Sequence, residues 1–512
     1  GGLKDTIPPV LLRAYPKLNN TLFDKDEIEL VFDEYLQMKD LKRQLIISPP
    51  IEKSYYKIKP PESVVSKKIE IELLDSLDEN TTYTFNFGKS IADYNEGNVL
   101  PFFYYAFSTG PELDSLEIRG KIDDALEKET ESFISVYLYP ADSTFNDSTI
   151  FLKKPFYVTS TLDSIIYNFK NIREGEYEII AIKDEAANYL FDQNIDKIGF
   201  TDKPIRLPKD SIIDLTIFKE TENFSWGRPF FVNKNRLGIQ YYGDLRNMKE
   251  LKLISEVPGK FISLVNRDRV KDTINYWFKG LDVDSLQFSL QGIDTIRNST
   301  VKFRENKEKD SLIIRSLSGG IIEFKDTFKL SSNIPILKIN KEFIHVQNID
   351  STKIPFEVSL DENYDIVNIL FKVEPNDEYE ISIFPDAIND FFDNTNESLS
   401  YNLESRDIEY YGNIFIQIIR ENDESFILEL LDKDFNVVRK EKTSDEADLY
   451  VFRHLPPGDY YVRYIKDLNN NGRWDTGNYL KKIQPEKVLY YPNELQLRSN
   501  WDLNENFFIE KN

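Results

Sequence analysis

The chain has 512 residues, which is too many for a single hydrophobic core, so several domains are expected. Its 88 acidic and 64 basic residues leave a net charge of -24, which disfavours contact with nucleic acids and with anionic lipid surfaces. Cysteine is absent and the two histidines, His345 and His454, are far apart in sequence. The absence of cysteine excludes disulfides, thiolate metal sites and cysteine nucleophiles. Serine–histidine–aspartate triads and histidine zinc sites are poorly supported.

Strand signals are dense along the whole sequence, whereas helix signals are weak. Segments such as YTFNFG (83–88) and YEIIAIKD (177–184) are rich in β-branched and aromatic residues, and Asn, Asp, Pro and Gly separate such segments. The best short helix candidate is 34–45. No uninterrupted apolar run approaches the roughly 18 residues that a transmembrane helix needs. The sequence predicts an all-β chain of sandwiches.

An internal duplication defines two of the domains. YNFKNIREGEYEIIAIKD (167–184) and YVFRHLPPGDYYVRYIKD (450–467) share, without a gap, a Tyr-x-Phe start, a Gly-acid-Tyr sequence and a strand that ends Ile-Lys-Asp. Upstream, RGKIDD with SFISVYL parallels YGNIFI with SFILELL. One domain type therefore occurs twice, at 113–213 and at 405–512.

The duplication predicts equivalent positions in the two copies. Gly175 should superpose on Gly458, and Tyr177 on Tyr460. Each glycine is expected at the turn before a strand, and each tyrosine in a core.

A weaker similarity links TTYTFNFGKSIADYNEGN (81–98) with DEYEISIFPDAINDFFDN (377–394), and each lies just upstream of one copy of the duplicated domain. The simplest organisation is two pairs of domains that flank a central β segment, in which Trp226 and Trp277 are expected core residues. The predicted domains are 1–112, 113–213, 214–325, 326–404 and 405–512.

The first domain resembles bacterial Ig-like domains of the S-layer type. The segments that carry this resemblance are DTIPPVLLRAYP (5–16), IELVFDEYL (28–36), LDENTTYTFNFG (77–88), IADYNEGN (91–98) and FSTG (107–110). The duplicated domains are similar to the transthyretin-like modules of carboxypeptidase-regulatory and collagen-adhesin B-type domains, and we call them B-type domains. These resemblances imply tandem Ig-like and transthyretin-like β-sandwiches in an extended multi-domain chain.

The order of domains resembles that of Bacteroidota surface lipoproteins that begin with an Ig-like domain. In that family the mature chain follows a lipidated cysteine and a glycine-rich linker, and Gly1-Gly2 looks like that linker. The resemblance implies a lipid anchor upstream of residue 1, in the outer membrane and facing the cell surface.

The segment DLNNNGRWDTGNY, 467–479, places oxygen-bearing side chains on alternate positions, which is the spacing of a calcium loop. The candidate ligands are Asp467, Asn469, Asn471, the carbonyl of Arg473, and Asp475. The twelfth position, where an EF-hand has a bidentate glutamate, is Asn478, so weak binding of a structural calcium ion is expected. The alternative is an Asn/Gly-rich hairpin that needs no ion.

The matching segment of the first B-type domain, DEAANYLFD (184–192), serves as a comparison. It keeps a carboxylate at each end, but Ala186 replaces one candidate ligand and Tyr189 stands in place of the glycine. This copy is expected to hold no ion. A loop that can lose its metal while its domain persists is structural and not catalytic.

An Asp-(Ser/Thr)-(Ile/Leu/Thr) pattern occurs twelve times and resembles the O-glycosylation sequon of exported Bacteroidota proteins. The alternative is an Asp-Ser turn that precedes a strand. The candidate acceptors are Thr6, Ser76, Ser115, Ser143, Ser148, Ser164, Ser211, Thr273, Ser285, Thr295, Ser311 and Ser351.

Taken together, these features predict a non-enzymatic surface lipoprotein that acts as a scaffold or interaction subunit of an outer-membrane protein complex, for example in β-barrel assembly or secretion. The expected partners are outer-membrane proteins or other surface lipoproteins, and not nucleic acid. The alternative is a glycan-binding or adhesive surface module. A hydrolase would need converging carboxylates in a pocket, most plausibly within 214–325.

Overall fold

The computed structural model describes residues 5–280, 284–292, 296–304, 310–421, 423–443 and 448–510. It is 48% strand and 4% helix, so the chain is all-β and is built from tandem β-sandwiches, as predicted. The α-helices of the described residues are single turns, α1 (Leu41–Gln44) and α2 (Thr149–Leu152). None of the described helices has the length and apolar character that crossing a membrane requires.

The helix expected over 34–45 is largely wrong. Strand β2 (Glu27–Met38) continues through its first half, and only α1 is helical. The side chains of β2 alternate between buried and less buried, and its backbone pairs with three other strands. This pairing outweighs the local preference of a short segment.

The chain divides into two compact units, which are described separately. The first contains residues 1–220 and 465–488, and the second contains 221–464 and 489–512. The loop 465–488, which we call the C-terminal loop, therefore lies in the sequence of the second B-type domain but belongs to the first unit. The sequence did not predict that this loop belongs to the first unit.

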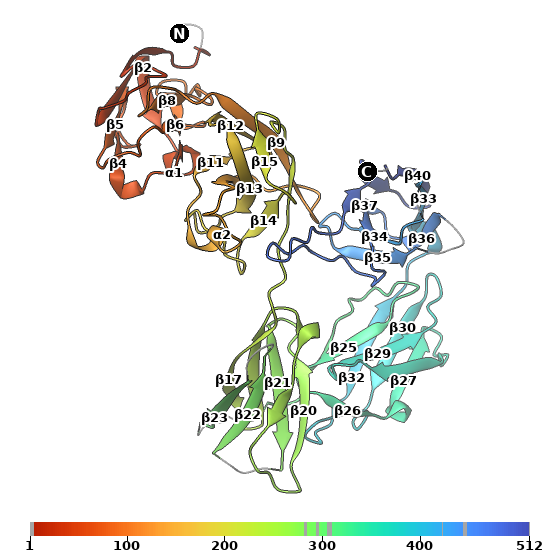
Figure 1. Ribbon diagram of the computed structural model, residues 1–512. Coiled ribbons are helices and arrows are strands. Elements are labelled where there is room, and N and C mark those ends of the chain that lie inside the picture. The colour runs from red at the N-terminus through yellow and green to blue at the C-terminus, as the bar shows by residue number, and fades with distance from the viewer. Residues whose placement is uncertain are drawn as a thin grey trace. The chain divides into compact units, whose positions relative to one another are not determined.

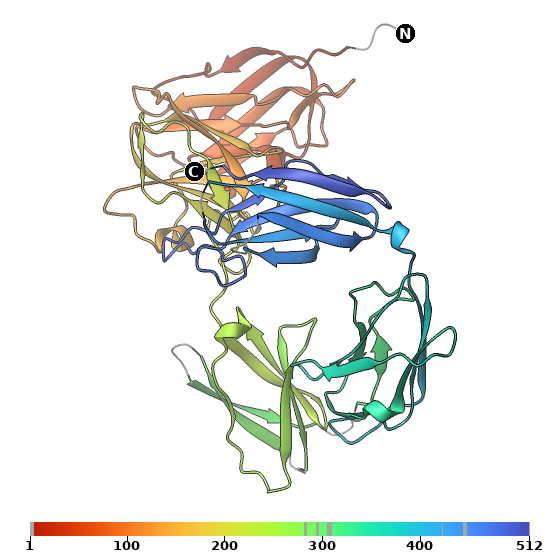
Figure 2. The same cartoon turned by 90° about the vertical axis from the view of Figure 1, so that its right-hand side faces the viewer.

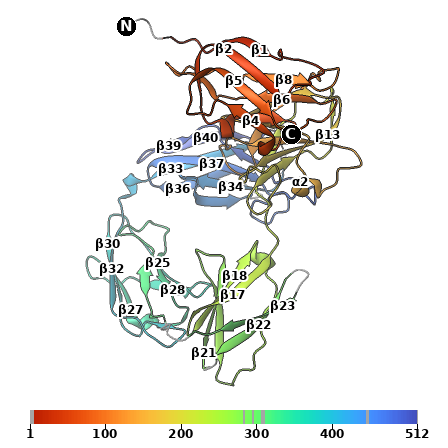
Figure 3. The ribbon, with the colours of Figure 1, turned by 90° about the vertical axis from the view of Figure 1, so that its left-hand side faces the viewer.

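The first unit begins with an Ig-like sandwich whose two sheets enclose Phe32, Phe85 and Phe107 (Figures 1 and 3). One sheet has the order β1-β2-β5-β4, with β7 also paired to β2, and the other has the order β3-β6-β8. Besides β2, its strands are β1 (Leu11–Tyr15), β3 (Ile46–Ser48), β4 (Tyr56–Lys59), β5 (Ser66–Leu73), β6 (Thr82–Asn86), β7 (Ile91–Asp93) and β8 (Tyr104–Ser108).

The first B-type domain follows in the same unit. One sheet has the order β11-β10-β13-β14, with β15 also paired to β13, and the other has the order β12-β9-β16. Its strands are β9 (Leu116–Asp124), β10 (Ser135–Pro140), β11 (Tyr157–Ser160), β12 (Ile166–Ile172), β13 (Gly175–Lys183), β14 (Lys197–Phe200), β15 (Ile205–Leu207) and β16 (Leu215–Ile217).

The second unit opens with the central domain, shown in green in Figure 2. Its sheets have the orders β17-β18-β21-β20 and β19-β22-β23. Trp226 lies in the core between them, as expected, whereas Trp277, which is more deeply buried, packs against Ile334 and Phe391 of the next domain. The strands are β17 (Ser225–Asn233), β18 (Arg236–Tyr242), β19 (Leu251–Leu253), β20 (Ile262–Arg267), β21 (Thr273–Lys279), β22 (Ser285–Gln291) and β23 (Ile296–Lys302).

The next domain repeats the sheet orders of the first Ig-like domain. Orders β24-β25-β29-β28 and β27-β30-β32 are accompanied by the pair β26-β31, which matches the β2-β7 pair. Asp93 and Asp390, the last residues of β7 and β31, are each 1% exposed and accept backbone N–H groups of the turn that follows. The strands are β24 (Ile314–Ser316), β25 (Phe328–Ser332), β26 (Ile336–Ile339), β27 (Ile344–Asn348), β28 (Phe356–Leu360), β29 (Ile366–Phe371), β30 (Glu378–Ile383), β31 (Ile388–Asp390) and β32 (Leu399–Glu404).

The second B-type domain has the orders β35-β34-β37-β38, with β39 paired to β37, and β36-β33-β40. These are the orders of the first copy, and in both copies the last strand joins its sheet in parallel. The predicted duplication is therefore confirmed. The strands are β33 (Gly412–Ile419), β34 (Phe426–Leu431), β35 (Val437–Lys442), β36 (Leu449–Leu455), β37 (Gly458–Lys466), β38 (Val488–Tyr490), β39 (Leu495–Leu497) and β40 (Asp502–Phe508).

The shared Gly-acid-Tyr sequence has the same role in both copies. Gly175 opens β13 and Gly458 opens β37. Tyr177 and Tyr460 are each 5% exposed, and each hydroxyl donates a hydrogen bond to the carbonyl four residues earlier, at 2.9 and 2.7 Å. This bond satisfies the polar end of a ring that is otherwise buried in the core.

Candidate functional site

The predicted calcium loop begins at Asp467, which directly follows β37 and is 1% exposed. Its Oδ1 accepts the N–H of Asn471 at 2.9 Å, and its Oδ2 accepts the N–H of Gly472 at 2.7 Å. In the first copy, Asp184 accepts the N–H groups of residues 188 and 189 at 3.2 and 2.8 Å. Both aspartates therefore hold the same turn, by accepting hydrogen bonds from the backbone N–H groups four and five residues later.

The backbone of the two turns also matches. In the second copy, Asn470 and Gly472 have φ angles of 55° and 77°. In the first copy, Ala187 and Tyr189 have φ angles of 51° and 63° at the corresponding positions. A tyrosine therefore occupies a left-handed conformation where the other copy has glycine, so this turn does not depend on the glycine.

A second carboxylate closes each turn, and it was not predicted from the sequence. In the first copy, Asp196 accepts the N–H groups of residues 185 and 192 at 3.0 and 2.8 Å. In the second copy, Glu486 accepts the N–H groups of residues 468 and 475 at 2.9 and 3.0 Å. Residues 192 and 475 are equivalent in the gapless alignment, so only the closing carboxylate has shifted. The stretch before it grows from three residues, 193–195, to ten, 476–485, and we call this longer stretch the insertion.

The closing carboxylates carry an electrostatic cost. Burial raises the pKa of Glu486, and the negative charges of Asp475 and Asp467 raise it further. Burial likewise raises the pKa of Asp196, with added contributions from the charges of residues 184 and 192. Each turn therefore brings three carboxylates close enough to repel one another.

The second turn is closed by its own hydrogen bonds. The side-chain amides of Asn469 and Asn471 both donate to Asp475 Oδ2 at 2.6 Å, and Arg473 Nε lies 3.2 Å from Asp475 Oδ1. Both amides would have to turn over before their oxygens could face a cation. No group of three or more histidine, cysteine or acidic residues in the described ranges is arranged to hold a metal ion. Calcium at Asp467 and its neighbours therefore stays a prediction.

The insertion 476–485 carries Tyr479, which is 1% exposed and lies in a cluster of the first B-type domain. We call the surrounding residues Tyr139, Phe151, Phe191, Phe200 and Phe218 the aromatic socket. The Tyr479 ring lies edge-on to Phe200, with 5.3 Å between ring centroids.

Polar contacts fix the same loop. The N–H of Tyr479 donates to the carboxylate of Glu220, and Thr476 Oγ1 donates to the carbonyl of Lys219 at 2.6 Å. Gln484 donates to the carbonyl of Phe200 and to Asp202 at 2.9 Å each. Lys482 Nζ lies 2.9 Å from Asp147 and 3.9 Å from the centroid of the Tyr479 ring.

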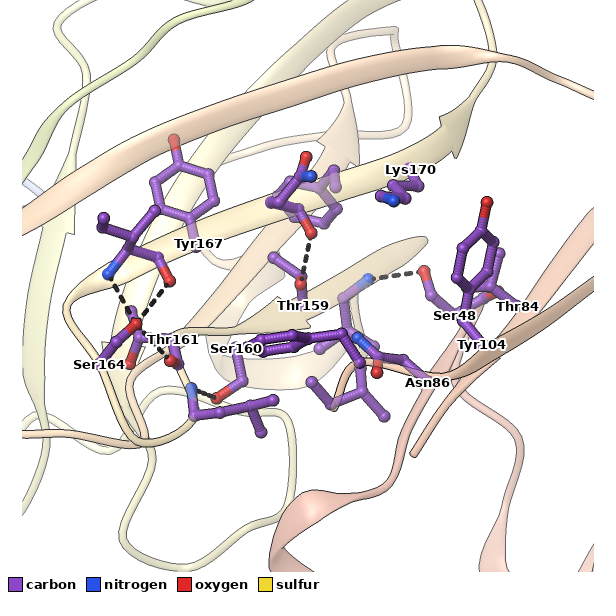
Figure 4. A pocket seen from close by; sticks show the side chains of 17 residues that line it. Ser48, Thr84, Asn86, Tyr104, Thr159, Ser160, Thr161, Ser164, Tyr167 and Lys170 are labelled. Carbon is purple, nitrogen blue, oxygen red and sulfur yellow. Dashed lines mark hydrogen bonds between the residues drawn. The ribbon is translucent and has the colours of Figure 1, made fainter. Parts of the chain in front are cut away.

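A second hollow lies within the first unit, between the Ig-like domain and the first B-type domain (Figure 4). It is a cavity of 490 Å³ lined by residues of β3, β6 and β8 on one side and of β11 and β12 on the other. The two sides are joined by a hydrogen bond of 3.0 Å from the N–H of Val158 to Ser48 Oγ.

The cavity lining is unusual for so acidic a chain, because Lys170 is its one charged residue. Serine and threonine residues such as Ser160, Thr159 and Ser164 line it, together with aromatic residues. Lys170 Nζ lies 4.7 Å from the centroid of the Tyr104 ring, so the charge rests on an aromatic face. Such a lining suits a neutral ligand better than an ionic one.

Nine of the candidate glycosylation residues are exposed: Thr6, Ser76, Ser115, Ser143, Ser148, Ser164, Ser211, Ser311 and Ser351. Ser285 is half-buried, and Thr273 is only 8% exposed in β21. Thr295 and the linker-like Gly1-Gly2 lie outside the described residues. The turn interpretation also has support, since Asp142 accepts the N–H of Thr144 at 2.8 Å.

The comparisons with known proteins identify one family. The model of the bacterial Ig-like domain family matches residues 5–109, so the chain carries such a domain at this position. None of the curated proteins compared with the chain matches it.

Similar solved structures include the Bacillus anthracis TIE protein, at 10% identity and a TM-score of 0.16, covering 99% of this chain and 75% of that one. They also include BcpA, the major pilin subunit of Bacillus cereus, at 10% identity and a TM-score of 0.14, covering 77% and 99%. Domains 1–6 of the surface layer protein SbsC are 11% identical, with a TM-score of 0.16, covering 96% and 68%. At such low TM-scores, the fold assignment depends on the sheets and the family match alone.

Proposed function

We propose that this chain is a non-enzymatic, surface-exposed outer-membrane lipoprotein of the Bacteroidota, held by a lipid anchor upstream of residue 1. It serves as a scaffold and interaction subunit of an outer-membrane protein complex, for example one for β-barrel assembly or secretion. Its partners are outer-membrane proteins or other surface lipoproteins, and it binds no nucleic acid.

The observation that supports this proposal best is the way one of its domains receives a loop. The aromatic socket takes up a tyrosine from a distant part of the chain, and hydrogen bonds to Glu220 and Phe200 fix the loop around it. A buried aromatic anchor surrounded by polar contacts is the anatomy of a protein–protein interface. Sandwich domains with such surfaces suit a scaffold better than a catalyst.

The test is to purify the tagged full chain from native membranes in mild detergent and to identify its companions by mass spectrometry. We expect the chain in the outer-membrane fraction, accessible to protease on intact cells, with an integral outer-membrane protein in stoichiometric amount. A chain that is recovered alone, or from the soluble fraction, would contradict the proposal.

The cavity supports a second candidate, a glycan-binding surface module. Its lining joins aromatic rings with hydroxyl and amide groups and carries a single charge, which suits a neutral polyhydroxylated ligand. Glycan-array binding that is lost in a Tyr104→Ala chain and kept in a chain altered at an exposed tyrosine such as Tyr94 would favour this function over the scaffold.

A bound ion and a covalent modification belong to the same proposal. Calcium, if bound at Asp467, Asn469, Asn471, Arg473 and Asp475, has a structural role. Sugar is attached to exposed residues of the Asp-Ser/Thr pattern, which intact-mass and peptide mapping of the native protein can test. Thr273 serves as an internal control, because its burial should leave it unmodified.

A further inference from the structure

The C-terminal loop is built as a separate hairpin on a narrow neck. Its two ends are joined by the N–H of Lys466, which donates to the carbonyl of Lys487 at 2.9 Å. Near its tip, the N–H and carbonyl groups of Asn478 and Ile483 are paired at 2.8 and 2.9 Å. The hairpin can therefore leave the aromatic socket without disrupting the strands that flank it.

The inserted residues contact a surface of complementary charge. Within 476–485 the sequence TGNYLKKIQP contains two lysines and no acidic residue. Lys482 pairs with Asp147, Gln484 with Asp202, and the N–H of Tyr479 with the carboxylate of Glu220, which is 4% exposed. A basic aromatic loop thus fits an acidic aromatic surface in a chain whose net charge is -24.

The described part of the second B-type domain has a different surface at the corresponding place. On the first copy, Tyr137 and Ile180 face each other across β10 and β13 and belong to the cluster that receives Tyr479. At the place of Ile180 the second copy has Arg463, which donates two hydrogen bonds to Glu429, at 2.9 and 2.7 Å. Among the described residues, the surface that matches the loop therefore lies on the first B-type domain, and an ion pair occupies the corresponding place on the second.

From these observations we propose that the aromatic socket is a self-association site, and that two copies of this chain exchange their C-terminal loops. The same contacts form in either case, because every copy carries one loop and one socket. Within one chain the loop is held at a high effective concentration, so the exchanged dimer forms at high protein concentration or where chains are held close together.

Substitutions that remove the Tyr479 hydroxyl can test this contact directly. It is buried, and no hydrogen-bond partner is present for it among the described residues. A buried hydroxyl without a partner weakens the contact that buries it. Tyr479→Phe should therefore strengthen docking, whereas Tyr479→Ala should empty the socket.

The experiment uses full-length chains and a fluorescent peptide that spans 465–488. We expect the Tyr479→Ala chain to bind this peptide at least about tenfold more tightly than the wild type does, because its own loop no longer fills the socket. Leu480→Ala, which alters an adjacent side chain that is 52% exposed, should behave like the wild type. A peptide carrying Tyr479→Phe should bind several-fold more tightly, and one carrying Tyr479→Ala should not bind.

Sedimentation of the full chains then tests self-association itself. The wild type and the Leu480→Ala chain should form dimers with rising concentration, and the Tyr479→Ala chain should remain monomeric. If Tyr479→Ala unfolds the domain, as circular dichroism would show, Lys482→Glu replaces it as a milder way to open the loop. No peptide binding by the opened chain, or a dimer that forms equally well without the tyrosine, would overturn the proposal.

Discussion

The two B-type domains have the same sheets and differ in what they place on the outside. Both keep the strand orders, the core tyrosine with its backward hydrogen bond, and the aspartate turn after the long central strand. The first copy covers the outer face of its sheet with an aromatic cluster, whereas the second buries the Arg463–Glu429 ion pair on the corresponding face. The core therefore defines the domain type, and the outer face and the turn define its contacts.

The turn shows how a new contact can arise on an unchanged scaffold. Asp184 and Asp196 close a short turn in the first copy, and Asp467 and Glu486 make the same backbone contacts in the second. Because the closing carboxylate accepts hydrogen bonds from both ends of the turn, the stretch before it can grow by seven residues, from three to ten, without a change in the strand orders. Those residues are the ones that carry Tyr479 into the aromatic socket.

The largest effect is expected at the ion pair that distinguishes the second copy. Glu429→Ala leaves the buried guanidinium of Arg463 without its carboxylate, which should cost about 3–5 kcal/mol. The double change Glu429→Tyr with Arg463→Ile copies the face of the first domain and should restore most of that loss. Hydrogen exchange of β34 and β37, measured by mass spectrometry in full-length chains, reports the stability of this domain. Exchange in Glu429→Ala that equals the wild type would show that the ion pair is unimportant, and equally fast exchange in both variants would show that the apolar pair does not replace it.

The next effect tests whether the two turns are equivalent. Asp184→Ala and Asp467→Ala each remove the acceptor of two backbone N–H groups, so each should destabilise its turn by about 1–3 kcal/mol. The local loss should be similar in both, as measured by exchange of the amides at 188–189 and 471–472. A large loss in one copy only would show that the turns differ despite their matching geometry.

The same two variants decide the calcium prediction. A cation that binds only the folded turn would stabilise it by about 1.4 kcal/mol at ten times its Kd. Millimolar calcium should then raise the melting temperature of the full chain relative to chelator, and Asp467→Ala should abolish this response. Asp184→Ala should leave it intact if only the second copy binds the ion. An unchanged melting temperature in the wild type would make both copies simple turns.

A smaller effect is expected from the core tyrosines. Tyr177→Phe and Tyr460→Phe each remove one hydrogen bond to a carbonyl but keep the buried ring. Each change should lower the free energy of unfolding of its domain by about 1 kcal/mol. The two losses should be nearly equal, because the geometry of the hydrogen bond is the same in both domains. Calorimetry of the full chain resolves the two losses if the domains melt separately. Unequal losses would indicate that the tyrosine and its hydrogen bond have a different role in one of the two domains.

The repeats explain how much the sequence could predict. The gapless Gly-acid-Tyr match placed Gly175 and Tyr177 on Gly458 and Tyr460 correctly, because a core strand and its corner depend on residues adjacent in sequence. The short helix at 34–45 failed, because pairing with distant strands decides the conformation of β2.

The candidate site was predicted less completely than the fold. The loop at Asp467 was singled out as a possible ion site, but the closing role of Glu486 was missed, because the insertion separates it from the turn it completes. The docking of Tyr479 could not be predicted either, because its partners lie about 260 to 340 residues earlier and no local pattern records such a contact. The only sequence feature that pointed to this contact was an aromatic residue, Tyr479, in the part of the loop that is longer than in the first copy.

The smallest effect concerns the charge that closes the second turn. The pKa of Glu486 is raised in the folded chain by burial and by the charges of Asp475 and Asp467. Its ionised form therefore destabilises the closed turn at neutral pH, and this penalty disappears as the pH falls through the folded pKa towards the ordinary value near 4.5. Because the group is partly exposed, solvent reduces the gain to well below the ~1.4 kcal/mol that one full pKa unit represents.

In the presence of chelator, the aspartate turn should be slightly more stable at pH 5 than at pH 7. The measurement is the temperature at which the C-terminal loop is released, followed with a fluorophore near Tyr479. Glu486→Gln should flatten this dependence, whereas the exposed control Glu397→Gln should not. Added calcium should flatten it too if an ion sits among the three carboxylates, since a cation removes the repulsion that raises the pKa. A pH dependence that survives in Glu486→Gln would place the titrating group elsewhere, with Asp196 of the first turn as the next candidate because its pKa is raised in the same way.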